Sequence, residues 1–77
     1  MAETVRVSGI EVAIEGSKVF FEDRLLGTIG REERLGQMFW RAYDPTTGEV
    51  YKRFFTARHE AIRLLLINAD LLDGLGF

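Results

Sequence analysis

The sequence contains no cysteine and only one proline, one histidine and one tryptophan. Without cysteine there is no disulfide and no thiolate metal site, which is typical of a reducing compartment, so we expect a cytoplasmic protein. The longest uninterrupted apolar run is the stretch 64–67, far shorter than the roughly 20 residues that span a bilayer. The N-terminus shows neither a basic leader nor an apolar block, so we expect neither secretion nor membrane insertion.

Groups that support catalysis or metal binding are equally scarce. His59 is the only histidine, and with Arg58 and Glu60 beside it we expect an exposed helix residue rather than a base or a ligand. Gly27 and Gly30 lack the lysine and the following helix of a phosphate-binding loop, so they indicate a strand bulge or a close backbone approach. The sequence therefore predicts no enzymatic activity, no cofactor and no metal.

The size and charge of the chain restrict the remaining classes of protein. Its 77 residues suffice for one domain, and 47% hydrophobic with 29% charged residues is an ordinary globular balance. The net charge is −2, the wrong sign for a protein whose affinity rests on phosphate contacts. The middle of the chain, 18–63, carries nine basic and seven acidic residues and is therefore weakly positive, at +2.

The first half of the chain predicts short strands separated by polar turns. In 10–15, large apolar side chains at 10, 12 and 14 alternate with Glu11, Ala13 and Glu15, the period of a half-buried strand. Residues 4–7, 18–21 and 25–30 are expected to be further short strands. Ser8-Gly9, Glu15-Gly16-Ser17 and Glu22-Asp23-Arg24 are the turns between these strands. The charged stretch 31–36 is expected to be an exposed link into a fifth strand at 37–43.

Residues 37–55 predict a β-hairpin around the turn Asp44-Pro45-Thr46-Thr47-Gly48. Asp44 can accept hydrogen bonds from amides two or three residues on, and Gly48 suits the left-handed position of a type I turn with a G1 bulge. This turn places Asp44 opposite Glu49 and Tyr43 opposite Val50. Continued outward, the register pairs Arg41 with Lys52 and Phe39 with Phe54 on one face, and Ala42 with Tyr51, Trp40 with Arg53 and Met38 with Phe55 on the other. Arg53 is expected to lie over the Trp40 indole.

Residues 56–73 predict a helix, because Thr56 is a good N-cap and no breaker follows before Gly74, the latest plausible C-cap. One stripe of this helix consists of Ala57, Ala61, Leu64, Leu65 and Asn68. We expect an α+β fold with the order β-β-β-β-β-β-α, in which this helix covers the Met38/Trp40/Ala42/Phe55 face of an antiparallel sheet. The single domain then comprises short strands at 1–36, the hairpin 37–55, the helix 56–73 and a tail, 74–77, whose Leu75 and Phe77 either pack back on the core or bind a second chain.

The best candidate for a working surface is the other face of the predicted hairpin. It combines three aromatic residues with two cations: Phe39, Arg41, Tyr43, Lys52 and Phe54. Such a face suits a protein interface with an aromatic and arginine hot spot, or nucleic-acid bases stacked on the rings with the cations at phosphates. The alternative is that the N-terminal hairpin, 5–16, folds across this face and buries it.

The second half of the chain also resembles a class of DNA-binding domains. Trp40-x-Ala42, a turn at Gly48, an aromatic at Phe54 or Phe55, Thr56 and then Glu60-Ala61 leading a helix resemble the sheet-plus-helix domains of plant ethylene-response regulators and phage integrase arm domains. The resemblance spans about residues 38–66. It implies a sheet that enters the major groove with arginines on its free face, a role that only Arg41 and Lys52 match here.

Taken together, the sequence favours a small non-catalytic interaction module. We expect it to bind a protein partner, or to self-associate, through a sheet face or edge, in the manner of a phage-type regulator or inhibitor. DNA binding through the aromatic and basic face is the alternative hypothesis.

Overall fold

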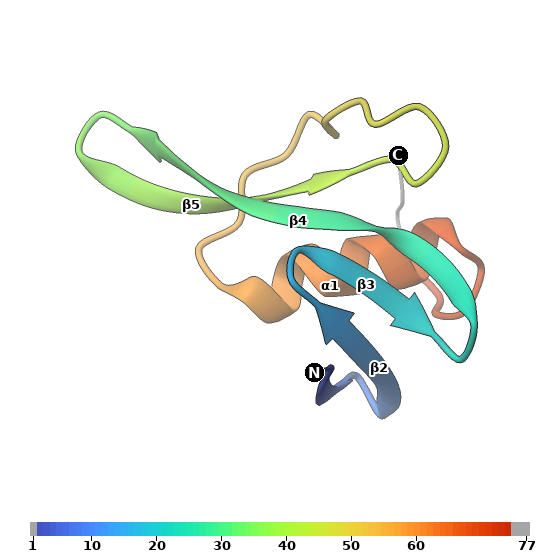
Figure 1. Cartoon of the computed structure of the whole chain (residues 1–77). Coiled ribbons are helices and arrows are strands. Elements are labelled where there is room, and N and C mark those ends of the chain that lie inside the picture. Colours follow the sequence, from blue (N-terminus) through green and yellow to red (C-terminus); the bar gives the residue numbers. More distant parts are fainter. Residues whose placement is uncertain (1, 75–77) are drawn as a thin grey trace.

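The computed structural model describes residues 2–74 and shows five strands followed by one helix (Figure 1). The elements are β1 (Glu3–Val7), β2 (Ile10–Glu15), β3 (Lys18–Phe21), β4 (Arg24–Arg34), β5 (Gln37–Tyr43) and α1 (Arg58–Asn68). The strands form one antiparallel sheet in the order β1-β2-β3-β4-β5, a simple meander. The predicted α+β class with one C-terminal helix is confirmed, whereas the predicted sixth strand is wrong.

Two-residue turns explain this meander. Val7 pairs with Ile10 around Ser8-Gly9, and Arg34 pairs with Gln37 around Leu35-Gly36. Both residues of each turn have positive φ, between 52° and 81°, as in the type I′ turns that match the twist of a hairpin. The expectation of an exposed link at 31–36 is therefore wrong, because β4 continues to Arg34 and only Leu35-Gly36 turn the chain.

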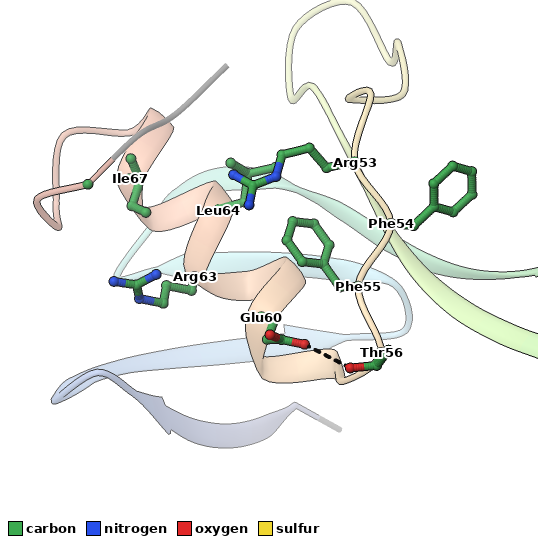
Figure 2. Close-up of a pocket in the computed structure, with 9 residues that line it drawn as sticks. Arg53, Phe54, Phe55, Thr56, Glu60, Arg63, Leu64 and Ile67 are labelled. Atoms are coloured by element: carbon green, nitrogen blue, oxygen red, sulfur yellow. Dashed lines mark hydrogen bonds between the residues drawn. The ribbon is translucent and has the colours of Figure 1, made fainter.

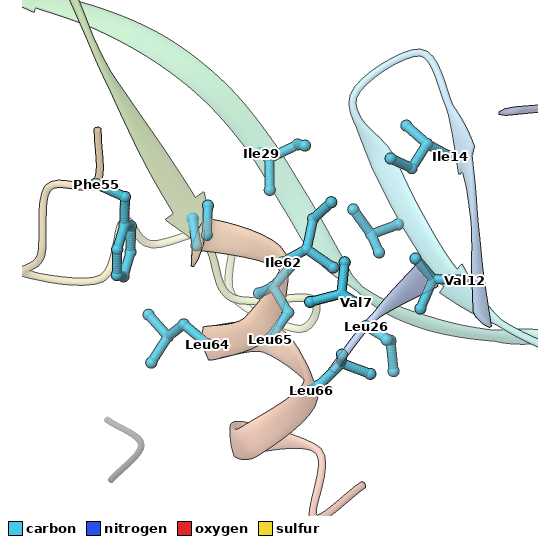
Figure 3. Close-up of a cluster of buried hydrophobic side chains, with 13 residues drawn as sticks. Val7, Val12, Ile14, Leu26, Ile29, Phe55, Ile62, Leu64, Leu65 and Leu66 are labelled. Carbon is cyan, nitrogen blue, oxygen red and sulfur yellow. The ribbon is translucent and has the colours of Figure 1, made fainter. Parts of the chain in front are cut away.

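The hydrophobic core lies between the concave face of the sheet and α1 (Figure 3). The helix contributes Ala61, Ile62, Leu64, Leu65 and Leu66, and the sheet contributes Val7, Val12, Ile14, Val19, Leu26, Ile29 and Ala42. Each fully buried Leu or Ile side chain stabilises the fold by roughly 1.5–3 kcal/mol relative to exposure. Ala42 and Phe55 are buried and Trp40 packs against the core, as expected of the face under the helix, but Met38 lies beyond it and is 49% exposed.

The helix is shorter than the sequence predicted. Its N-cap is Ala57, and Glu60 accepts hydrogen bonds from the Ala57 amide and the Thr56 hydroxyl, both at 3.2 Å. At the other end Asp70 adopts the left-handed conformation, with φ at 63°. The amides of Asp70 and Leu71 then donate to the carbonyls of Ile67 and Leu66, the pattern of a Schellman motif, so the helix ends at Asn68 and does not reach Gly74.

The turn after β5 forms as predicted. The Asp44 carboxylate accepts hydrogen bonds from the amides of Thr46 and Thr47 at 2.7 and 2.9 Å, and Gly48 has φ at 76°. These amide hydrogen bonds, from Thr47 first and Thr46 second, lower the pKa of Asp44 below its ordinary range. The Asp44 amide donates to the Glu49 carbonyl, and Tyr43 forms a bridge with Val50, so this part of the register is confirmed.

The predicted strand after this turn does not form. The Arg53 amide donates to the Tyr51 carbonyl two residues back, a tight loop that takes Lys52 out of the pairing. Trp40 consequently pairs with Phe55 rather than with Arg53. The Arg53 guanidinium lies 5.2 Å from the Phe55 ring centroid, while the cation over the Trp40 ring is Arg31, at 5.5 Å.

Gly27 is a point of close approach between the sheet and the helix. The register shifts here, because Val19 pairs with Gly27 and Phe20 with Leu25, which leaves Leu26 as the extra residue of a bulge. Gly27 has φ at 147°, and a Cβ at this position would lie 2.5 Å from the Tyr43 carbonyl oxygen. It would also lie 2.7 Å from Leu65 Cδ2 on α1. The predicted bulge and close approach are thus confirmed at Gly27.

Gly27→Ala should lower the free energy of unfolding by about 2–4 kcal/mol, because the new methyl group meets backbone and core atoms at a φ that side chains rarely adopt. Gly30→Ala is the matched control on the same strand, where the nearest atom to an added Cβ is 3.5 Å away. Urea unfolding followed by Trp40 fluorescence measures both changes. Equal effects of the two substitutions would contradict the close approach at Gly27.

Candidate interaction surface

The far ends of β4 and β5 form a two-stranded ribbon that projects from the rest of the sheet (Figure 1). On one side, β3 pairs with β4 only as far as Thr28. On the other side, Trp40 is the last β5 residue that pairs with the returning chain, at Phe55. We call residues 30–39 the distal ribbon. Isolated two-stranded hairpins are marginally stable in water, so this ribbon needs support from outside its own ladder.

Alternation along the strands gives the distal ribbon two different faces. Glu32 pairs with Phe39 and Arg34 with Gln37, so these four side chains share the outer face with Arg41, which pairs with Gly30. The inner face, on the side of α1, carries Arg31, Glu33, Met38 and Trp40. The predicted working surface corresponds to the outer face.

Arg41, one of the predicted site residues, does not lie free on that face. It is 7% exposed, and its guanidinium donates to Glu32 Oε1 at 3.0 Å and to the Tyr51 carbonyl at 2.8 Å. Its Cζ also lies 3.9 Å from the Phe54 ring centroid. One buried cation therefore joins β4, β5 and the returning chain. An arginine suits this role because its planar fork can bond two acceptors while it stacks on a ring.

The side chains of Phe54 and Phe55 lie on opposite faces of the sheet, at its β5 edge. Figure 2 shows Phe55 turned toward the helix and Phe54 turned away from it. On the outer face Phe54 meets Phe39 edge to face, with centroids 5.5 Å apart, and Arg34 lies over the same ring at 5.0 Å. This is a favourable geometry for aromatic pairs and for cation–π contacts. The predicted contact between Phe39 and Phe54 is therefore formed, although by a shifted register.

A shallow hollow of about 230 Å³ lies at the end of the outer face. We call its lining the hairpin surface: Arg34, Leu35, Gln37, Phe39 and Phe54. Leu35 is fully exposed at the tip of the ribbon and has φ at 54°, an uncommon conformation for leucine. Phe54 is 42% exposed. Two large apolar residues thus face solvent beside an arginine. Met38, the other strongly exposed apolar side chain of the ribbon, lies on the opposite face.

The five predicted site residues have different places in the structure. Phe39 and Phe54 line the hollow, and Arg41 lies buried against Phe54. Tyr43 is half-buried with its ring next to Gly30, and Lys52 is exposed but is not part of the lining. The N-terminal hairpin does not cover this face, because β1 and β2 lie at the opposite edge of the sheet from β5.

Sequence reasoning missed Arg34 and Leu35. The signal was present, because Leu35-Gly36 separates two stretches of strand-like alternation by two residues, which is the spacing of a tight hairpin turn. The charges of Arg31 to Arg34 concealed it, since they read as an exposed loop rather than as a strand.

A larger hollow of about 740 Å³ lies between α1 and the chain that returns past β5 (Figure 2). Phe55, Leu64 and Ile67 form its apolar floor, and Arg53 and Arg63 lie in its wall. Gly74, the last described residue, also belongs to this wall. The expectation for Leu75 and Phe77, that they pack back or bind a second chain, concerns residues outside the described part of the chain.

The other candidates for chemistry stay apart from both hollows. His59 is exposed on α1, as predicted. No group of three or more His, Cys, Asp or Glu side chains in residues 2–74 is arranged to hold a metal ion. Across the same residues, no helix combines the length and the apolar character required to cross a bilayer.

Comparison of the chain with protein families, with curated proteins and with solved structures gives no match. The resemblance to sheet-plus-helix DNA-binding domains therefore stays a prediction.

Arg41→Ala should lower the free energy of unfolding by about 2–3 kcal/mol, because it removes two hydrogen bonds and the contact with Phe54 from a buried position. Lys52→Ala removes an exposed cation of the same predicted site and should change stability by no more than about 0.5 kcal/mol. Urea unfolding of the two variants and the wild type measures the difference. If Arg41→Ala costs no more than Lys52→Ala, the structural role of Arg41 is wrong.

Proposed function

We propose that this chain is a non-catalytic interaction module that binds a protein partner through the hairpin surface. The observation that carries the proposal is Leu35, a fully exposed leucine at φ 54° beside a hollow walled by Phe39 and Phe54. A large apolar side chain at the tip of a projecting ribbon lowers solubility and does not pack in the hydrophobic core. Exposed apolar groups of this kind, clustered beside an arginine, are typical of the centre of a protein interface.

The supports beneath the surface favour the same proposal. Arg41 and Phe39 hold the Phe54 ring, so one wall of the hollow is already ordered before a partner arrives. Leu35 belongs to a two-residue turn, which leaves its backbone little freedom. Pre-organised contact groups lose less conformational entropy on binding, which raises affinity without additional contacts. A regulator or inhibitor that acts by occupying its partner requires no more than such a surface.

The charge of the distal ribbon favours protein over nucleic acid as the partner. The DNA hypothesis relied on Arg41 and Lys52 as phosphate contacts, yet Arg41 is buried and already paired with Glu32. Within the ribbon itself, residues 30–39, the arginines at 31 and 34 are matched in number by the glutamates at 32 and 33, so its formal net charge is zero. Phosphate recognition requires an excess of positive charge that this ribbon does not have.

The proposal predicts that Leu35→Ser and Phe54→Ala each weaken partner binding by at least about tenfold, because both remove apolar contact area from the centre of the interface. Lys52→Ala should leave binding unchanged, since Lys52 lies outside the hollow. Immobilised wild type and variants are exposed to an extract of the source cells, and retained proteins are compared by quantitative mass spectrometry. Circular dichroism verifies that each variant is folded.

A partner retained equally by all four proteins would contradict the proposal. The nucleic-acid alternative is tested in parallel by fluorescence anisotropy with labelled duplex DNA. Binding that fades steeply with salt and weakens in Lys52→Ala would favour that alternative, whereas no binding at low salt agrees with a protein partner.

A further inference from the structure

We infer that the open edge of β4 pairs with the same edge of a second copy of this chain, in an antiparallel ladder over residues 30–34. This inference goes beyond the proposed function, because it uses the edge of the distal ribbon and leaves the outer face free. It rests on the directions of the backbone groups and on the arrangement of four charges.

The backbone of the distal ribbon presents unpaired groups along β4. Trp40 exchanges two hydrogen bonds with Phe55, at 2.7 and 3.0 Å, so its amide and carbonyl point away from β4. Arg31, the cross-strand partner of Trp40, must then point its own amide and carbonyl away from β5. Glu33, two residues further along β4, points its amide and carbonyl to the same side as Arg31. Because β3 pairs with β4 only as far as Thr28, these groups lie on an edge that no other described strand covers.

Pairing with the second copy can begin directly where the pairing of β3 with β4 ends. The Ile29 amide already donates to the Ser17 carbonyl at 2.8 Å, so Gly30 is the first residue whose neighbour on this side is absent from the described chain. Unpaired edges of this kind are templates for another strand. Five residues, 30–34, remain before the turn at Leu35.

The charges of this segment are self-complementary in one antiparallel register. The outward-pointing amides and carbonyls of Arg31 and Glu33 must bond to the same groups of the second copy. A register with Glu32 opposite Glu32 of the second copy meets this requirement. In that register Arg31 lies opposite Glu33 of the other copy, and the pair occurs twice. Opposite charges directly across a ladder are stabilising, and like charges are destabilising.

The remaining charges are compatible with this register. Glu32 already binds Arg41 at 3.0 Å and Arg34 at 3.4 Å within its own copy, so the two Glu32 side chains would meet as neutralised groups. No ion pair is formed by Arg31 or Glu33 within the described residues, and each therefore gains a partner in the dimer. A segment that is complementary to itself favours a second copy over an unrelated strand, and the contact closes around a two-fold axis.

A charge-exchange cycle tests the inference. Arg31→Glu places two glutamates opposite one another, and Glu33→Arg places two arginines opposite one another. Each substitution should weaken dimerisation by about tenfold, because both symmetric pairs change from attractive to repulsive. The double substitution restores opposite charges in reversed order and should recover wild-type affinity. Arg63→Glu, an exposed helix residue, controls for the change in net charge.

Sedimentation equilibrium of the full chain measures the dimer up to roughly 1 mM protein, since a short ladder buries little area and a dissociation constant of roughly 10–500 μM is expected. A wild type that stays monomeric over this range would overturn the inference. So would a double variant that dimerises no better than the single ones. Dimers that respond to Leu35→Ser but not to charge exchange would place self-association on the hairpin surface and exclude the β4 edge.

Discussion

The buried guanidinium of Arg41 is the contact on which the distal half of the molecule depends. It binds Glu32 on the neighbouring strand and the Tyr51 carbonyl on the returning chain, and it supports the Phe54 ring. A cation removed from water is costly unless it is well paired. These acceptors and the ring pair the two terminal nitrogens, whereas the buried Nε has no hydrogen-bond acceptor among the described residues. The arrangement converts a two-stranded ribbon, which would be only marginally stable alone, into a platform with an ordered outer face.

The two halves of the sheet consequently have different tasks. The proximal half, with β1 to β3 and the start of β4, carries most of the sheet's buried apolar side chains, which belong to the same core as those of α1. The distal ribbon adds little to that core and exposes Leu35 at its tip and Met38 on its inner face, and the partly exposed Phe54 lies beside its outer face. A fold that buries its apolar groups well at one end and presents them at the other suits a small binding module. Its open β4 edge adds a second, chemically different surface.

The features that could be predicted from the sequence are those set by local chemistry. Asp44 and Gly48 determine the turn after β5 through their own hydrogen bonds and φ angle, and alternation placed Ala42 and Phe55 under the helix. The features that the sequence did not predict correctly depend on tertiary contacts. The Arg53 amide and the Arg41 guanidinium both donate to the Tyr51 carbonyl. No local sequence pattern predicts the resulting shift in the pairing register after Tyr51. Of the predicted site residues, Phe39 and Phe54 do meet. The support role of Arg41 follows only from its neighbours across the strands, which the sequence does not specify. Which surface the N-terminal hairpin occupies depends on strand order, which alternation does not specify.

Amide hydrogen exchange, resolved by residue and compared between the wild type and Arg41→Met, tests the support role of Arg41 most directly. The account predicts that Arg41→Met loses protection at Trp40, Tyr51 and Phe55 and along the distal ribbon, while β2 and α1 keep theirs. The methionine fills part of the volume but bonds neither Glu32 nor the Tyr51 carbonyl, so local opening at this end becomes easier. Unchanged protection across the ribbon, or an equal loss throughout the chain, would contradict a role of Arg41 in holding the hairpin surface in place.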